Sequence, residues 1–96
     1  VLIGRSAASS KAKEAIAKIQ QGGVRVVIAQ ADVCNQADLL QVLEEIKASM
    51  SPLRGIFHAA GVVGYQTLNE MNWSAFETVT RPKILGGWNL HQLTQD

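Results

Sequence analysis

Apolar residues alternate along this chain between short unbroken runs and stripes spaced three or four residues apart. Val1–Ile3 is a short apolar run, and it predicts the end of a buried strand. The next apolar positions recur at helical spacing, which predicts a helix capped by Ser9 or Ser10 and running to about Gln21. Gly22-Gly23 should end that helix, since glycine is the usual residue after a last helical turn.

The same strand-then-helix pattern recurs twice more. Val24–Ala29 is rich in β-branched residues with little alternation, which is typical of a strand covered on both faces. Asn35 should cap a second helix with Asp38 in a capping-box-like position, and Ser51-Pro52 should end it. Gly55–His58 then predicts a third buried strand. The apolar stripe of the second helix comprises Leu39, Leu43, Ile46 and Met50, widened by Leu40 and Val42.

The last third of the chain predicts two separate helices. Asn72 should cap a short helix over Trp73–Val79, and Pro82 should begin another that runs to about Leu93, because proline fits a first helical turn. Lys83 would then face the positive end of the helix dipole, at a cost of about 0.3–1 kcal/mol. Either that cost is tolerated by a solvated lysine, or a function keeps Lys83 there.

Strand and helix alternate three times, which predicts an α/β fold with a doubly wound parallel sheet covered by helices. The net charge of +1 and the absence of a basic cluster argue against nucleic acid or an anionic membrane as a partner. No apolar run approaches the roughly 20 residues that span a bilayer. A single cysteine, Cys34, suits a reducing, cytoplasmic location, and no set of metal ligands occurs.

Candidate chemistry gathers just after the three predicted strands, where parallel sheets bind ligands. Gly4 allows a sharp turn, and Arg5 and Ser6 offer a guanidinium and a hydroxyl to a phosphate. Asp32, followed by Val33, either accepts a hydrogen bond from an adenine amine or forms a turn. An alternative interpretation of Arg5 is equally open, in which it is a surface arginine that follows a strand.

The third predicted strand leads into residues that remove side-chain bulk. Ala59, Ala60 and Gly61 leave room for a flat ring and a ribose against the backbone, although tight packing also favours small residues. His58 is better interpreted as a packed or hydrogen-bonded residue at the strand end than as a catalytic base. No orienting partner for such a base is evident in the sequence.

Four segments in this order resemble the ketoreductase domain of modular polyketide synthases, in the short-chain dehydrogenase/reductase superfamily. The resemblance covers essentially the whole chain and implies a Rossmann-like fold. The segments are Leu2–Ser6, Ala31–Val33, Gly55–Val62, and Arg81-Pro82-Lys83 followed by Gly86–Leu90.

The resemblance implies a role for each candidate residue. Arg5, with Gly4 and Ser6 beside it, would hold the 2′-phosphate of NADPH, and Asp32 and Val33 would contact the adenine. His58, Ala59, Ala60 and Gly61 would flank the nicotinamide ribose, and Lys83 would be the catalytic lysine. The implied reaction is reduction of a β-ketoacyl thioester carried on the phosphopantetheine of an acyl carrier protein, among neighbouring synthase domains.

By this resemblance, residues 1–96 would be a partial NADP-binding Rossmann domain. The glycine-rich strand and turn would precede Val1, and the catalytic serine, tyrosine and asparagine would follow Asp96, so we expect these residues alone to be inactive. The loop residues Val63-Gly64-Tyr65 replace a Leu-Asp-Asp marker of one stereochemical class. Two alternatives stay open, the equivalent reductase of an animal-type fatty acid synthase and a non-catalytic Rossmann-like scaffold.

The assignment of Arg5 predicts a change in cofactor preference. In a complete domain that contains this chain, Arg5→Ala should weaken NADPH binding and leave NADH binding nearly unchanged, because only NADPH carries the 2′-phosphate. Titration of the two cofactors by fluorescence measures both affinities. An unchanged ratio of the two dissociation constants would remove the role assigned to Arg5.

Overall fold

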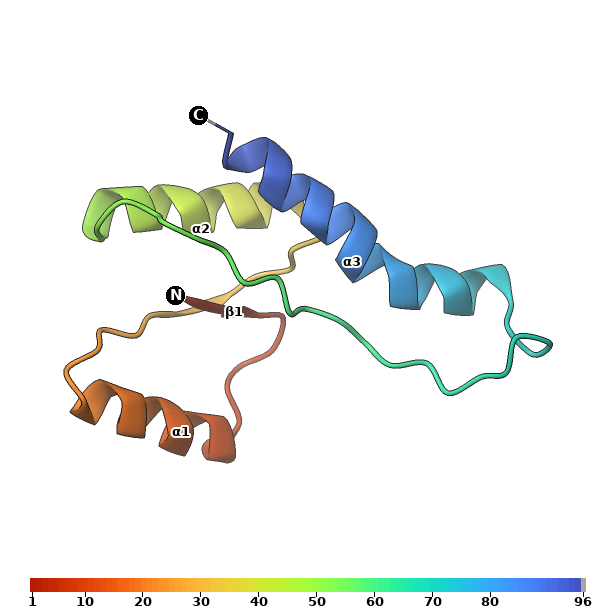
Figure 1. Ribbon diagram of the computed structural model, residues 1–96, viewed down its shortest axis with the longest axis horizontal. Coiled ribbons are helices and arrows are strands. Elements are labelled where there is room, and N and C mark those ends of the chain that lie inside the picture. The colour runs from red at the N-terminus through yellow and green to blue at the C-terminus, as the bar shows by residue number, and fades with distance from the viewer. Residues whose placement is uncertain (96) are drawn as a thin grey trace. The chain divides into compact units, whose positions relative to one another are not determined.

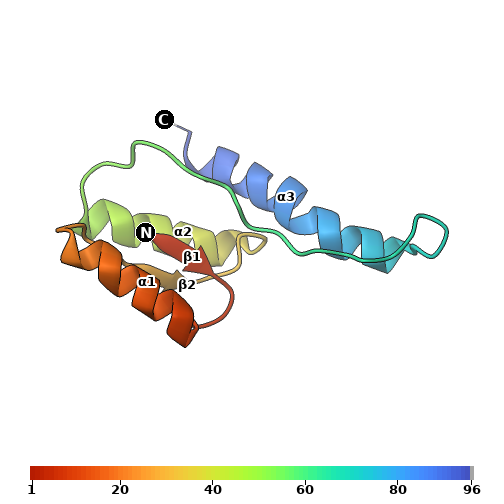
Figure 2. The same ribbon diagram turned by 60° about the horizontal axis from the view of Figure 1, so that its bottom comes forward.

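The computed structural model describes residues 1–95, which divide into two compact units. The first unit comprises Val1–Asp32, and the second begins at Val33. Figures 1 and 2 together label the elements of both units along the chain. Each unit has its own secondary structure.

The first unit is a parallel strand–helix–strand motif. Strands β1 (Leu2–Gly4) and β2 (Ile28–Gln30) pair in parallel, and helix α1 (Ser10–Gln21) lies between them in sequence. The register places Gly4 opposite Gln30. Figure 2 shows the two strands side by side and pointing the same way. The parallel pairing confirms the strand direction predicted from the alternation of strands and helices.

Helix α1 begins and ends where the sequence predicts. Its cap is Ser9, whose hydroxyl accepts a hydrogen bond from the Ala12 amide at 3.2 Å. After the last turn the chain passes through Gly22 to Gly23, which has a positive φ of 86°. Glycine adopts that backbone conformation without the steric penalty of a Cβ, so the Gly-Gly pair stops the helix.

Two of the predicted strands differ from the structure. The strand predicted over Val24–Ala29 is replaced by the shorter β2, because β1 offers only three residues as ladder partners. Gly55–His58, the third predicted strand, has no assigned strand structure within the part of the chain described. A strand needs a neighbour for its hydrogen bonds, and the apolar run by itself supplies none.

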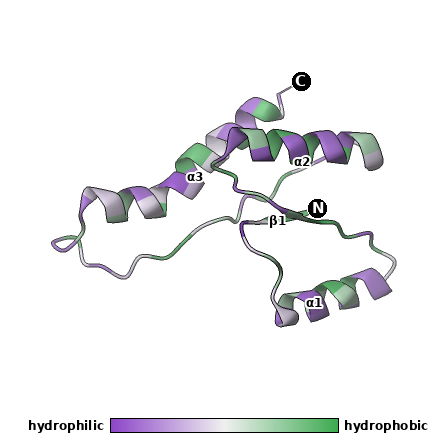
Figure 3. Ribbon diagram, turned by 180° about the vertical axis from the view of Figure 1, so that it is seen from behind, coloured by the Kyte–Doolittle hydropathy of each residue, from purple (hydrophilic) through white to green (hydrophobic). Residues whose placement is uncertain are grey.

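The second unit contains helix α2 (Gln36–Ser49) and helix α3 (Trp73–Leu93). Asn35 caps α2 as predicted, since its side-chain oxygen accepts hydrogen bonds from the two amides at positions 37 and 38. The helix stops ahead of Ser51-Pro52. Figure 3 shows hydrophobic positions along α2 interspersed with hydrophilic ones, as in an amphipathic helix.

Helix α3 corrects the prediction of two separate helices. Asn72 caps it as expected, accepting a hydrogen bond from the Ala75 amide at 2.8 Å. The helix then runs without interruption through Pro82, which lies in its interior. The Pro82 nitrogen has no hydrogen to donate, so the intrahelical hydrogen bond to the Thr78 carbonyl is lost. A bend in the middle of α3 is visible in Figure 1, as expected for a helix with an internal proline.

The continuous helix removes the electrostatic argument about Lys83. Lys83 lies near the middle of α3, ten residues after Trp73, and not in a first turn as predicted. The dipole effect is confined to the terminal turns, so Lys83 is not opposed by it. Any functional role of Lys83 therefore depends on the residues that surround it in the folded chain.

Helix α3 approaches the start of the second unit very closely. A Cβ placed on Gly86 would lie 2.7 Å from Val33 Cγ2 and 3.3 Å from Val33 Cβ. One turn on, the buried Asn89 donates a hydrogen bond from Nδ2 to the Val33 carbonyl at 2.9 Å. Leu39 of α2 is fully buried. Leu90 of α3 is buried as well, where α2 packs with the C-terminal half of α3 (Figure 1).

The contact at Gly86 predicts a difference between two neighbouring glycines. Gly86→Ala should lower the free energy of unfolding by about 1–3 kcal/mol, since a methyl group forced into packed surroundings costs that much. Gly87→Ala is the matched control, because its Cβ would meet only the His58 ring, at the ordinary distances of 3.7 Å from Cδ2 and 3.9 Å from Nε2, and alanine favours helix. Urea unfolding of a folded protein containing this chain measures both. Equal stability of the two variants would contradict the packing described.

Candidate functional site

In the first unit, the residues that are predicted to bind a phosphate and an adenine lie at one edge of the strand pair. Gly4 ends β1, and Arg5 and Ser6 follow it directly. Gln30 ends β2, and its side-chain amide donates a hydrogen bond to the Arg5 carbonyl at 3.2 Å. Asp32 comes two residues later, so the carboxyl ends of both strands present polar side chains at the same edge.

The hydrogen bond from Gln30 holds the Arg5 backbone while leaving its side chain exposed. The Ser6 side chain is also exposed, and Asp32 is partly buried. An exposed guanidinium beside a hydroxyl matches a phosphate in both charge and hydrogen-bond donors. The donor set of this edge therefore fits the phosphate-binding role that the sequence predicts.

In the second unit, the extended segment 58–64 runs along α3. A Cβ on Gly61 would lie 3.2 Å from Lys83 Cε, and one on Gly64 would lie 2.9 Å from Val79 Cγ2. His58 lies toward the C-terminal half of the helix, and Gly64 toward its N-terminal half. The segment and the helix therefore run in opposite directions, and the glycines allow them to approach.

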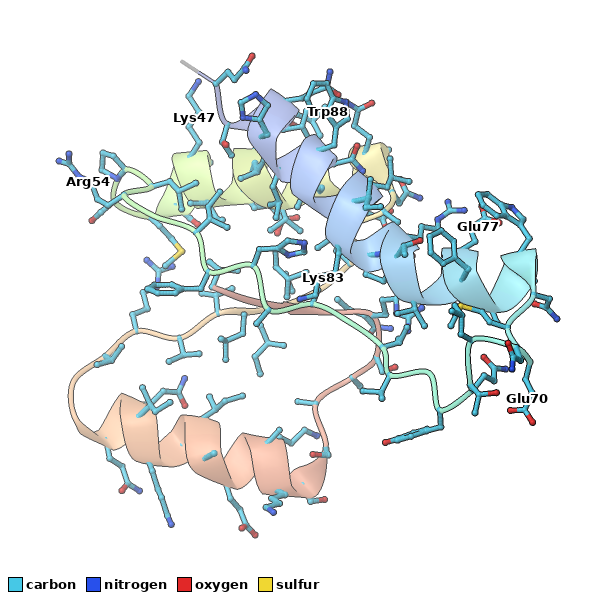
Figure 4. All side chains as sticks on the ribbon, turned by 45° about the vertical axis from the view of Figure 1, so that its right-hand side comes forward. Lys47, Arg54, Glu70, Glu77, Lys83 and Trp88 are labelled. Atoms are coloured by element: carbon cyan, nitrogen blue, oxygen red, sulfur yellow. The ribbon has the colours of Figure 1, made fainter. Side chains whose placement is uncertain are left out.

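Lys83 and Gly61 are brought together by this arrangement. The same hypothetical Cβ on Gly61 would lie 3.6 Å from Lys83 Nζ, so the lysine side chain extends across the glycine. Figure 4 shows the Lys83 side chain leaving α3 toward the extended segment, while Trp88 leaves the helix on another side. Lys83 is exposed, so its ammonium group is accessible next to the bare backbone of Gly61.

His58 has a specific hydrogen-bond partner. Its Nε2 lies 3.0 Å from the carbonyl oxygen of Pro82, the residue before Lys83. Its ring also lies near Gly86 and Gly87, where added Cβ atoms would be 3.5 Å from Cε1 and 3.7 Å from Cδ2. The expectation that His58 is packed or hydrogen-bonded is confirmed, although it does not end a strand, since residues 55–58 form none. Of the small residues that follow it, Ala60 is partly buried and Ala59 is exposed.

Two residues important to this geometry received no individual role from the sequence. Gly86 admits the Val33 side chain, and Asn89 holds the Val33 carbonyl. The available signal was a Gly-Gly pair inside a helix, which costs about 1 kcal/mol per glycine relative to alanine. Such a cost indicates close packing against the helix, but it does not identify the neighbour.

Some kinds of site find no support in the residues described. Among residues 1–95, no group of three or more histidine, cysteine or acidic side chains is arranged to hold a metal ion. No helix within the same residues is both long and apolar enough to cross a membrane. Cys34 is partly buried and forms no disulfide bond.

Comparison with known proteins identifies the family. The KR domain model matches residues 1–96. A mycocerosic acid synthase-like polyketide synthase of Mycolicibacterium smegmatis is 35% identical over 95 residues, which are 99% of this chain and 4% of that protein. A putative inactive phenolphthiocerol synthesis polyketide synthase of Mycobacterium tuberculosis, Pks1, is 32% identical over 85 residues, which are 88% of the chain and 5% of that protein.

A solved structure agrees with the family match. The crystal structure of a ketoreductase domain from the bacillaene assembly line is similar with a TM-score of 0.93 and 30% identity. The match covers 99% of this chain and 23% of the solved chain. The chain thus spans a small part of each protein that it matches. It belongs to the KR domain family, as part of a Rossmann-like ketoreductase domain of the polyketide synthase type.

Proposed function

We propose that this chain is part of an NADPH-dependent ketoreductase that reduces a β-ketoacyl thioester to the β-hydroxyacyl thioester. The substrate is carried on the phosphopantetheine of an acyl carrier protein, within a larger synthase. Membership of the KR domain family supports the reaction class. The observation that carries the proposal is the accessible ammonium group of Lys83 lying across the backbone of Gly61.

NADPH, when bound, supplies the hydride. In the first unit, Arg5 and Ser6 bind the 2′-phosphate by charge and hydrogen bonding, and Asp32 accepts from the adenine amine. In the second unit, Val33 contributes to the adenine contact, and the small residues from Ala59 to Gly61 leave the backbone open to a ribose. Neither set of side chains requires a metal ion for these roles.

Lys83 supplies the positive charge of the catalytic set. A cation beside a proton-donating phenol favours the ionised phenolate, and so favours proton transfer to the alkoxide that forms at the β-carbon. Tyr65 is exposed in the segment between α2 and α3, and we do not assign it as that donor. Lys83 orders the groups that pass the proton to the alkoxide and places a positive charge beside them. It does not donate the proton itself.

A non-catalytic role is the second candidate. It is favoured by one finding, which is that the related Mycobacterium tuberculosis protein is named as inactive. The two candidates differ in a simple measurement. A complete domain containing this chain should bind NADPH and oxidise it in the presence of an N-acetylcysteamine β-ketoacyl thioester, whereas a scaffold should do neither.

The role of Lys83 predicts a split between turnover and binding. Lys83→Ala should lower kcat by about 10²- to 10⁴-fold, the usual contribution of positioned acid–base catalysis, and change the NADPH dissociation constant little. Lys47→Ala is the matched control, since Lys47 is an exposed lysine on α2. Steady-state kinetics and fluorescence titration measure the two quantities. Weakened NADPH binding with kcat retained would make Lys83 a cofactor ligand instead.

The contact of Gly61 with Lys83 predicts an effect on activity without one on stability. Gly61→Ala should lower kcat, because its methyl group must displace Lys83 Cε from 3.2 Å. The free energy of unfolding should change little, since the displaced atom is the far end of a flexible side chain. Gly55→Ala is the control, because a Cβ there meets nothing within 4 Å. Equal turnover of both variants would show that this contact does not place Lys83.

A further inference from the structure

We infer that His58 is a positioning residue for Lys83, which it holds through the backbone carbonyl of Pro82. The inference rests on the proposed ketoreductase function and adds a role that the cofactor-flanking position of His58 does not imply. His58 Nε2 lies 3.0 Å from the Pro82 oxygen, one peptide bond before Lys83. The two residues come from segments 24 positions apart, so the bond joins the extended segment to α3.

The hydrogen bond to a carbonyl oxygen defines which ring nitrogen of His58 carries the proton. A carbonyl oxygen only accepts hydrogen bonds, so His58 Nε2 must carry the proton and donate it. In the neutral ring, Nδ1 is then unprotonated. The ring is held by this bond on one side and lies against Gly86 and Gly87 on the other, where added Cβ atoms would meet it at the ordinary contact distances of 3.5 Å and 3.7 Å.

The hydrogen bond from His58 reaches α3 at the residue where the helix lacks one of its own hydrogen bonds. Pro82 removes one hydrogen bond from the helix, and the helix bends in that region (Figure 1). A helix interrupted in this way has fewer restraints on the relative orientation of its two halves. His58 adds a restraint from outside the helix at the carbonyl of the interrupting residue itself, immediately before the lysine.

The same segment contacts the lysine side chain three residues later. Gly61 lies against Lys83 Cε, and His58 sets the position of the segment relative to the helix. Without the hydrogen bond, the segment and the helix can shift against each other, and Gly61 and Lys83 shift with them. Misplacement of a catalytic group by about 1 Å costs up to roughly 10²-fold in rate.

A matched pair of variants tests the role of the N–H group. His58→Gln places an amide N–H three bonds from Cβ, as in histidine Nε2, and His58→Met has the same reach without a donor. In a complete ketoreductase domain containing this chain, His58→Met should lower kcat by about 10- to 100-fold with little change in the KM for NADPH. His58→Gln should restore most of that kcat. Urea unfolding checks that both variants are folded.

A double-variant cycle separates positioning from direct contact. If His58 acts through Lys83, His58→Met should cause little further loss of kcat when Lys83 is already alanine. Equal losses in both backgrounds, a raised KM for NADPH, or failure of glutamine to restore turnover would each overturn the inference. If the unaltered domain neither binds NADPH nor reduces the thioester, the proposed function fails. Loss of stability alone in both variants would assign His58 to folding.

Discussion

The close approach of the extended segment 58–64 to α3 is the constraint on which the second unit depends. Gly61 meets Lys83 and Gly64 meets Val79, while on the helix Gly86 admits Val33 and underlies His58. An extended segment and a helix can approach each other this closely where a glycine in one of them leaves room for a side chain of the other. The glycines therefore set which part of the segment faces which turn of α3, and the position of Lys83 follows from that.

The proline in α3 has a compensating contact. An internal proline costs a helix about 3 kcal/mol and loosens it at that point. Here the Pro82 carbonyl accepts from His58, and the buried Asn89 ties the next turns to Val33. Both restraints come from outside the helix. In the role inferred for His58, these restraints hold the bent helix and with it the part of the backbone that carries Lys83.

Prediction from the sequence was accurate where one local interaction decides the outcome. The caps at Asn35 and Asn72 were correct, and Ser9 is the cap of the two serines predicted for α1, because each side chain bonds to an amide two or three residues away. The third strand failed because a strand depends on a partner, and the apolar run at Gly55–His58 does not reveal one. Pro82 was misplaced because a helix with a cap and good packing can continue through a proline.

The sequence by itself determined the helix boundaries at their caps, the parallel strand pair and the family to which the chain belongs. It also identified Lys83, although for an electrostatic reason that the structure removed. Only the tertiary structure decided that Lys83 lies across Gly61, that His58 bonds to Pro82, and that Asn89 bonds to Val33, 56 positions away. Such contacts depend on the path of the chain between distant residues, and local propensities do not specify that path.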